Sequence, residues 1–72
     1  MTTKEKIAML EDIMDLDEGT LTVDSVLDDF EEWDSLSKLS LIVEAKQKFG
    51  LILKPEILKN FKTVDDICQY LQ

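Results

Sequence analysis

The stretch from Asp34 to Gly50, DSLSKLSLIVEAKQKFG, constrains the fold of this chain more than any other. Its apolar residues recur at helical spacing in two adjacent stripes, a pattern typical of a helix that buries one side. The stripes consist of Leu36, Leu39 and Val43, and of Ile42, Ala45 and Phe49. Asp and Ser are residue types that cap helix starts, and Gly50 stands where a helix commonly ends. The pattern predicts a helix that begins at Asp34 or Ser35 and ends near Phe49.

Three further segments carry helical signals. A first helix is expected from about Thr3, as its cap, to Met14, because apolar residues recur there at spacings of three and four. Pro55 suits the first position of a short helix that ends near Leu58. Thr63 is expected to cap the last helix, with an acidic residue three positions later as in a capping box. The apolar stripe of this last helix consists of Val64, Ile67, Cys68 and Leu71.

Residues 15–34 are predicted to form a long loop between the first and second helices. The loop contains too many apolar residues for an unattached linker, and these are Leu16, Leu21, Val23, Val26, Leu27 and Phe30. We therefore expect it to lie across the bundle, with a short helical turn within DSVLDDF. The sequence predicts an all-α fold, a small bundle of three main helices plus one short helix, in a single domain of residues 1–72.

The composition argues against several classes of function. A net charge of −8 opposes nucleic-acid binding, since such binding depends on neutralising phosphates. With no His and one Cys, the chain lacks the ligands of a zinc site, and DLDEG departs from a calcium loop in the position of its Gly. No stretch approaches the roughly 20 apolar residues of a membrane span. We expect a monomeric cytoplasmic protein without a metal, without a signal peptide and without an enzyme's catalytic groups.

Ser35 lacks a partner that would make it a catalytic nucleophile. Lys38 lies three residues away, but a solvated lysine is protonated at neutral pH and is no base. The start of a helix nevertheless suits an attached phosphate, because unpaired N–H groups and the positive end of the helix dipole lie there. A serine in this position can accept a phosphodiester while another enzyme supplies the catalysis.

The stretch WDSLSKLSLIVEAKQKFG resembles the modification motif of acyl carrier proteins and of related peptidyl and aryl carriers. The hallmark of that motif is Asp-Ser-Leu at the start of the second helix, followed by apolar positions at helical spacing. The matching residues are Asp34, Ser35 and Leu36, continued by Leu39, Ile42 and Val43. The resemblance extends over the whole chain, from the first helix and long loop to a last helix that opens with Thr-Val.

This resemblance implies that Ser35 carries 4′-phosphopantetheine, which a separate phosphopantetheinyl transferase adds from coenzyme A. The thiol of that arm would hold an acyl or aminoacyl group as a thioester and present it to loading and processing enzymes, as in fatty acid or polyketide biosynthesis. Asp34 and Leu36 are the neighbours of the attachment site. Candidate walls of an acyl shelter between helices are Leu39, Ile42, Val43, Ile57 and Leu58. Candidate partner contacts are Glu31, Glu32, Lys38 and Glu44.

The charge distribution departs from that of fatty-acid carriers, whose second helix is typically acidic. Residues 35–49 have a net charge of +2, whereas residues 11–34 contain eleven Asp and Glu and no Lys. This polarity suggests a specialised stand-alone carrier whose partners contact the loop before Ser35 as well as the helix after it. The alternative is an unmodified helical interaction module that binds a basic partner through its acidic loop.

Two single residues complete the expectations. Trp33 stands where fatty-acid carriers usually have a smaller residue, and we expect it to hold the long loop against the bundle rather than to contact a partner. Cys68 falls on the apolar stripe of the last helix and is expected to be a small core residue, not a redox site.

Overall fold

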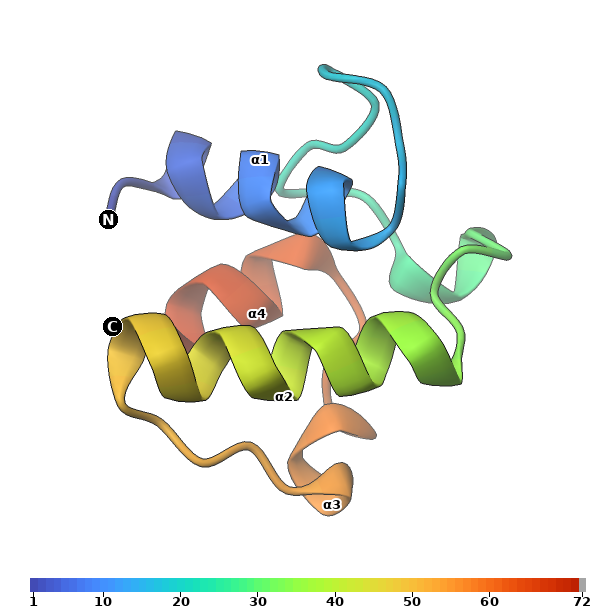
Figure 1. The fold of residues 1–72 in the computed structure, drawn as a ribbon. Helices are drawn as coiled ribbons and strands as arrows, with labels where there is room; N and C mark the ends of the chain where they lie inside the picture. The colour runs from blue at the N-terminus through green and yellow to red at the C-terminus, as the bar shows by residue number, and fades with distance from the viewer. Residues whose placement is uncertain (72) are drawn as a thin grey trace.

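A computed structural model describes residues 1–71, which form four α-helices and one short 3-10 helix (Figure 1). The elements are α1 (Thr3–Ile13), η1 (Leu27–Asp29), α2 (Ser35–Phe49), α3 (Pro55–Leu58) and α4 (Val64–Tyr70). Helix α1 packs against α2 and α4, while α3 lies on the opposite side of α2 from α1. Within the described residues the only strand-like pairing is a single antiparallel bridge between Val26 and Thr63. The predicted all-α bundle is confirmed.

The helix ends follow the predicted capping chemistry with one correction. Thr2, not Thr3, caps α1, because Glu5 stands three residues after Thr2 and completes a capping box. At the start of α4 the expected box is present, since the Thr63 side chain accepts from the Asp66 N–H and the Asp66 carboxylate accepts from the Thr63 N–H. Gly50 ends α2 with φ of 66°, a left-handed conformation that favours glycine.

The core lies between α1, α2 and α4. All four residues of the stripe predicted for the last helix are buried, which confirms that part of the pattern. Lys6 is also buried, and its Nζ donates to the Cys68 carbonyl oxygen at 3.0 Å, so it ties α1 to the last turn of α4. The buried apolar residues are Met9, Leu10, Met14, Leu21, Leu27, Trp33, Leu41, Ala45, Leu53, Leu58, Phe61, Val64, Ile67, Cys68 and Leu71.

The rotation of α2 about its axis differs from the sequence-based expectation. Leu36, Leu39 and Val43 are 75%, 57% and 46% exposed, so this stripe does not face the core. Leu41 and Ala45 are fully buried instead, and Ser37 lies on the same side one turn earlier. The sequence cannot choose between these sides because apolar residues occur on both. In the linker after α2, Leu53 is buried and Ile52 is exposed.

The long loop lies across the bundle, as predicted, and contains the expected helical turn as η1. The buried Glu11 carboxylate of α1 accepts a hydrogen bond from the Leu21 N–H at 2.9 Å. Farther along, the Leu27 N–H donates to the Lys62 carbonyl oxygen at 2.9 Å, beside the bridge to the segment before α4. The loop is therefore attached at both sides. Within residues 1–71, no helix has the length and apolar character needed to cross a membrane.

Candidate functional site

Ser35 is the first residue of α2 and is exposed, but it does not cap the helix. Asp34 is the cap, because its Oδ1 accepts from the Ser37 N–H at 3.0 Å. Ser37 is buried, and its hydroxyl donates to the Glu32 carbonyl oxygen, which holds the preceding loop against the first turn. The local structure therefore assigns capping to the neighbours of Ser35, and Ser35 itself is an exposed residue.

The first turn of α2 suits a phosphate attached to Ser35. The Lys38 N–H donates to the Asp34 carbonyl oxygen at 3.0 Å, which is the first backbone hydrogen bond of the helix. The Ser37 N–H donates instead to the Asp34 side chain. The N–H groups of Ser35 and Leu36 precede these and have no carbonyl partner within the helix. They lie at the positive end of the helix dipole, where an anion is stabilised. The residues present therefore fit the phosphodiester of a phosphopantetheine arm.

Trp33 belongs to the buried core, as predicted for a residue that holds the loop against the bundle. It is 7% exposed, and the Lys38 ammonium lies 5.8 Å from the centroid of its ring. This contact is a cation–π interaction, which fixes the position of a half-buried lysine one turn after Ser35. The two residues form part of the wall of a cavity of about 380 Å³. The cavity is lined by Val26, Asp28, Trp33, Lys38, Leu58, Lys59, Phe61 and Lys62.

The five candidate walls of an acyl shelter have different surroundings. Leu58 is buried and lines the cavity beside Trp33. Ile42 and Ile57 are half-buried and pack against the core. Leu39 and Val43 lie on the exposed side of α2. The structure thus places Leu58 close to the attachment end of α2, and the shelter role of the set stays a prediction.

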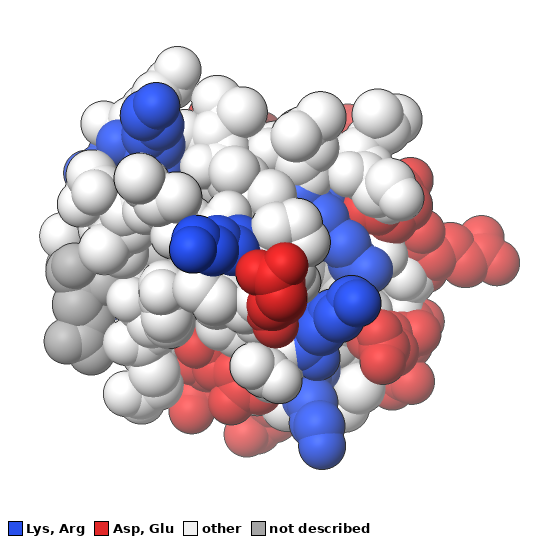
Figure 2. Space-filling model, turned by 90° about the horizontal axis from the view of Figure 1, so that it is seen from below, with Lys and Arg blue, Asp and Glu red and all other residues white. Residues whose placement is uncertain are grey.

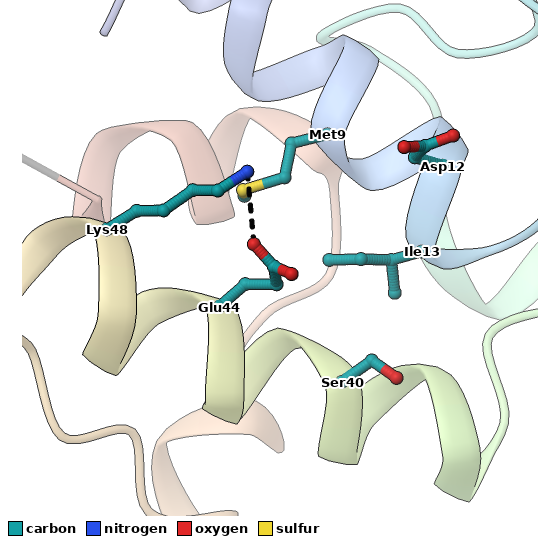
Figure 3. Close-up of a pocket in the computed structure, with 6 residues that line it drawn as sticks. All are labelled: Met9, Asp12, Ile13, Ser40, Glu44 and Lys48. Atoms are coloured by element: carbon teal, nitrogen blue, oxygen red, sulfur yellow. Dashed lines mark ion pairs between the residues drawn. The ribbon is translucent and has the colours of Figure 1, made fainter.

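The candidate partner contacts also separate in space. Glu31 and Glu32 are exposed just before α2, four and three residues ahead of Ser35. Glu44 lies about 180° from Ser35 around the helix axis, given about 100° per residue. There it forms an ion pair with Lys48, Oε2 to Nζ at 3.1 Å, in a cavity of about 270 Å³ between α1 and α2 (Figure 3). Glu44 Oε2 is buried and makes no hydrogen bond to the described residues, so Lys48 compensates its charge.

Three residues near the site were not identified from the sequence. Ser37 could have been found from its spacing, because it stands three residues after the cap Asp34. The N–H at that position commonly donates to the side chain of the cap. Lys59 and Lys62 come close to Lys38 only through tertiary folding, and the sequence held no signal for that arrangement.

Cys68 is a core residue, as predicted. It is buried in α4, and burial raises the pKa of its thiol, which keeps the thiol protonated near neutral pH. Residues 1–71 contain no group of three or more His, Cys, Asp and Glu side chains placed to hold a metal ion.

Comparison with known proteins identifies the class of this site. The family model described as "Phosphopantetheine attachment site" matches residues 7–71. The acyl carrier protein of Onion yellows phytoplasma (strain OY-M) is 37% identical over 68 residues, which cover 93% of this chain and 90% of the relative. The acyl carrier protein of Myxococcus xanthus is 35% identical over 77 aligned positions, which cover 99% of this chain and 96% of the relative. No solved structure gives a significant match.

These matches define a carrier with covalently attached 4′-phosphopantetheine, not an enzyme. The chain belongs to the acyl carrier protein family. The alternative of an unmodified interaction module is not supported by these comparisons.

Proposed function

We propose that Ser35 Oγ is the atom to which 4′-phosphopantetheine is attached, and that the arm holds acyl or aminoacyl groups as thioesters for delivery to partner enzymes. The observation that carries this proposal is an exposed serine at the first position of α2, next to a cap made by Asp34. Asp34 and Leu36 complete the motif on either side. The arm contributes the thiol that this chain's own surface lacks, since Cys68 is buried.

The attachment requires help from a second protein. A bond forms between Ser35 Oγ and the phosphorus of the pantetheine phosphate, and coenzyme A loses adenosine 3′,5′-bisphosphate. The serine proton must pass to a base, yet Lys38 lies over the Trp33 ring and the neighbouring Asp34 carboxylate is engaged as the cap of α2. The base therefore belongs to the transferase, and Ser35 is a passive acceptor.

The partners of this carrier would recognise an uneven charge distribution. Residues 11–34 carry eleven acidic side chains, and the exposed Glu31 and Glu32 come directly before the attachment helix. A partner with a basic surface can contact this loop while the arm enters its active site. This arrangement supports a specialised carrier with a dedicated set of loading and processing enzymes.

The attachment is tested by intact mass measurement. Incubation with coenzyme A and a broad-specificity phosphopantetheinyl transferase should add the mass of one phosphopantetheine to the wild-type chain. Ser35→Ala should abolish the gain. Ser40→Ala is the matched control, because Ser40 is also an exposed serine of α2 and lies about 140° away around the axis.

Two results would contradict the assignment of Ser35. One is a mass gain that persists in Ser35→Ala, which would place the arm elsewhere. The other is no gain in the wild-type chain with several transferases, although circular dichroism shows the chain to be folded.

A further inference from the structure

The cavity beside Trp33 has an unusual charge for this protein. Three lysines, Lys38, Lys59 and Lys62, line it together with one acid, Asp28. The local charge of the lining is +2 in a chain whose net charge is −8. Figure 2 shows the α3 side of the molecule, where lysine side chains cross the surface and most acidic side chains lie toward its margins.

The three lysines are not neutralised by ion pairs. Among residues 1–71 the only ion pair joins Lys48 to Glu44, on another side of α2. Asp28 shares the cavity but lies beyond ion-pair distance of the lysines. The Asp66 carboxylate accepts from the backbone N–H groups of Lys62 and Thr63; it interacts with the charge of Lys62 but forms no ion pair with it. Ammonium groups around an apolar floor of this kind favour an anion with a carbon chain.

The cavity lies within reach of an arm on Ser35. Lys38 follows Ser35 by three residues, so the two side chains are neighbours on the helix surface, with about 5–6 Å between their Cβ atoms. Trp33 precedes Ser35 by two residues and forms part of the same cavity wall. The volume of about 380 Å³ is near the lower end of the range for small-molecule sites, about 300–1,000 Å³. It suits a short group rather than a long fatty chain.

We propose that this cavity binds the free carboxylate of a short carboxyacyl group, one end of a dicarboxylic acid whose other end is the thioester on the arm. The proposal rests on attachment at Ser35. The ammonium groups of Lys38, Lys59 and Lys62 bind the carboxylate, and Trp33, Leu58 and Phe61 contact the methylene chain. An aminoacyl group would bring a cation to the same lysines and would be repelled. The cavity thereby selects cargo by charge.

Three arms of equal length test the charge selection. The transferase would load amide-linked analogues that carry a succinyl, a 4-oxopentanoyl or a 4-aminobutanoyl group, whose ends are anionic, neutral and cationic. Intact mass confirms loading, and NMR follows the indole N–H of Trp33 and the side-chain signals of the three lysines. The succinyl arm is expected to shift these signals. The neutral and cationic arms should leave them close to their positions with the unacylated arm.

Salt and lysine variants separate binding from incidental contact. The succinyl shift should be lost at about 1 M salt, where the Debye length is about 3 Å. It should also be lost in Lys59→Gln with Lys62→Gln. The control is Lys4→Gln with Lys46→Gln, which changes the net charge equally at exposed lysines outside this cavity and should retain the shift.

The possible failures point to different causes. If the wild-type chain is fully loaded but the succinyl and 4-oxopentanoyl arms shift the signals equally, or neither does, the cavity proposal is overturned and attachment at Ser35 stands. If the control pair loses the shift as completely as the cavity pair, the effect is one of net charge and the cavity proposal is likewise overturned. If no arm is added to Ser35, the proposed function fails and this proposal fails with it.

Discussion

Replacing Asp34 with alanine tests which residue caps helix α2. In the structure the Asp34 carboxylate accepts from the Ser37 N–H at 3.0 Å, while Ser35 is an exposed residue. Asp34→Ala removes both the hydrogen bond and a negative charge near the positive end of the helix dipole. Asp34→Asn keeps the acceptor oxygen and removes only the charge. Ser35→Ala removes neither.

The expected losses follow from this geometry. An N-cap residue replaced by alanine costs about 1 kcal/mol of unfolding free energy, within a range of about 0.5–2 kcal/mol. Asparagine ranks with aspartate as a cap, so Asp34→Asn should cost only about 0.3–0.5 kcal/mol through the dipole. Ser35→Ala should change stability by less than about 0.5 kcal/mol, as is usual at exposed positions without such contacts. A domain of 72 residues has about 4–11 kcal/mol in total, so all three variants should stay folded.

Urea unfolding at equilibrium measures these differences. Circular dichroism reports the helices, and the fluorescence of Trp33, the single tryptophan, reports packing at the start of α2. Each kcal/mol also lowers the melting temperature by about 4–8 °C for a domain of this size. The assay should use unmodified protein for every variant, so that the arm does not contribute.

Two outcomes would refute the reasoning. Equal losses for Asp34→Asn and Asp34→Ala would show that charge, not the hydrogen bond, stabilises the helix start. A loss near 1 kcal/mol for Ser35→Ala would show that the serine hydroxyl has a capping role that the geometry does not give it.

Three further predictions concern the rest of the fold. Glu11→Ala should lower the free energy of unfolding by about 2 kcal/mol, which is typical of a hydrogen bond to a charged group. It should also speed hydrogen exchange at the Leu21 amide. Glu11→Gln should retain part of the protection of this amide against exchange. Leu41→Ala should lower the free energy of unfolding by about 2–5 kcal/mol, because Leu41 is fully buried. Leu39→Ala, on the exposed side of α2, should lower it by less than about 0.5 kcal/mol. Equal losses in urea unfolding would contradict the observed rotation of the helix. Backbone N–H groups at the start of α4 lower the pKa of Asp66 in the folded protein. The contribution of Asp66 to stability is therefore present at neutral pH. It is lost as the pH falls from the unfolded-state pKa through the lower folded-state pKa. Asp66→Asn should therefore weaken the dependence of the urea midpoint on pH in this acid range, and an unchanged dependence would count against the assignment.

Local signals in the sequence were sufficient for most of the helix boundaries. The left-handed Gly50, the Pro55 start and the Thr63 box depend on residues within four positions of one another, so a linear pattern contains them. The one misplaced cap had the same kind of signal, because Glu5 matches Thr2 and not Thr3. Short-range hydrogen bonds of this kind are determined by residue type and spacing.

The rotation of α2 could not be predicted in this way. Its apolar residues surround too much of the helix for periodicity to identify the buried side, and in the folded bundle the buried residues are Leu41 and Ala45. For the same reason the sequence could not show which acyl-shelter candidates face the core, and Leu39 and Val43 lie on the exposed side. Burial depends on which elements approach, and one helix's sequence does not contain that information.

The sequence by itself determined the class of this protein, because the motif around Ser35, the helix order and the missing catalytic groups are all linear features. Only the tertiary structure decided that Ser35 is exposed while Asp34 and Ser37 hold the helix start. It also brought Lys59 and Lys62 beside Lys38 and Trp33 across twenty or more intervening residues. The close-packed core fixes the path of the backbone, and that path decides which surface side chains become neighbours.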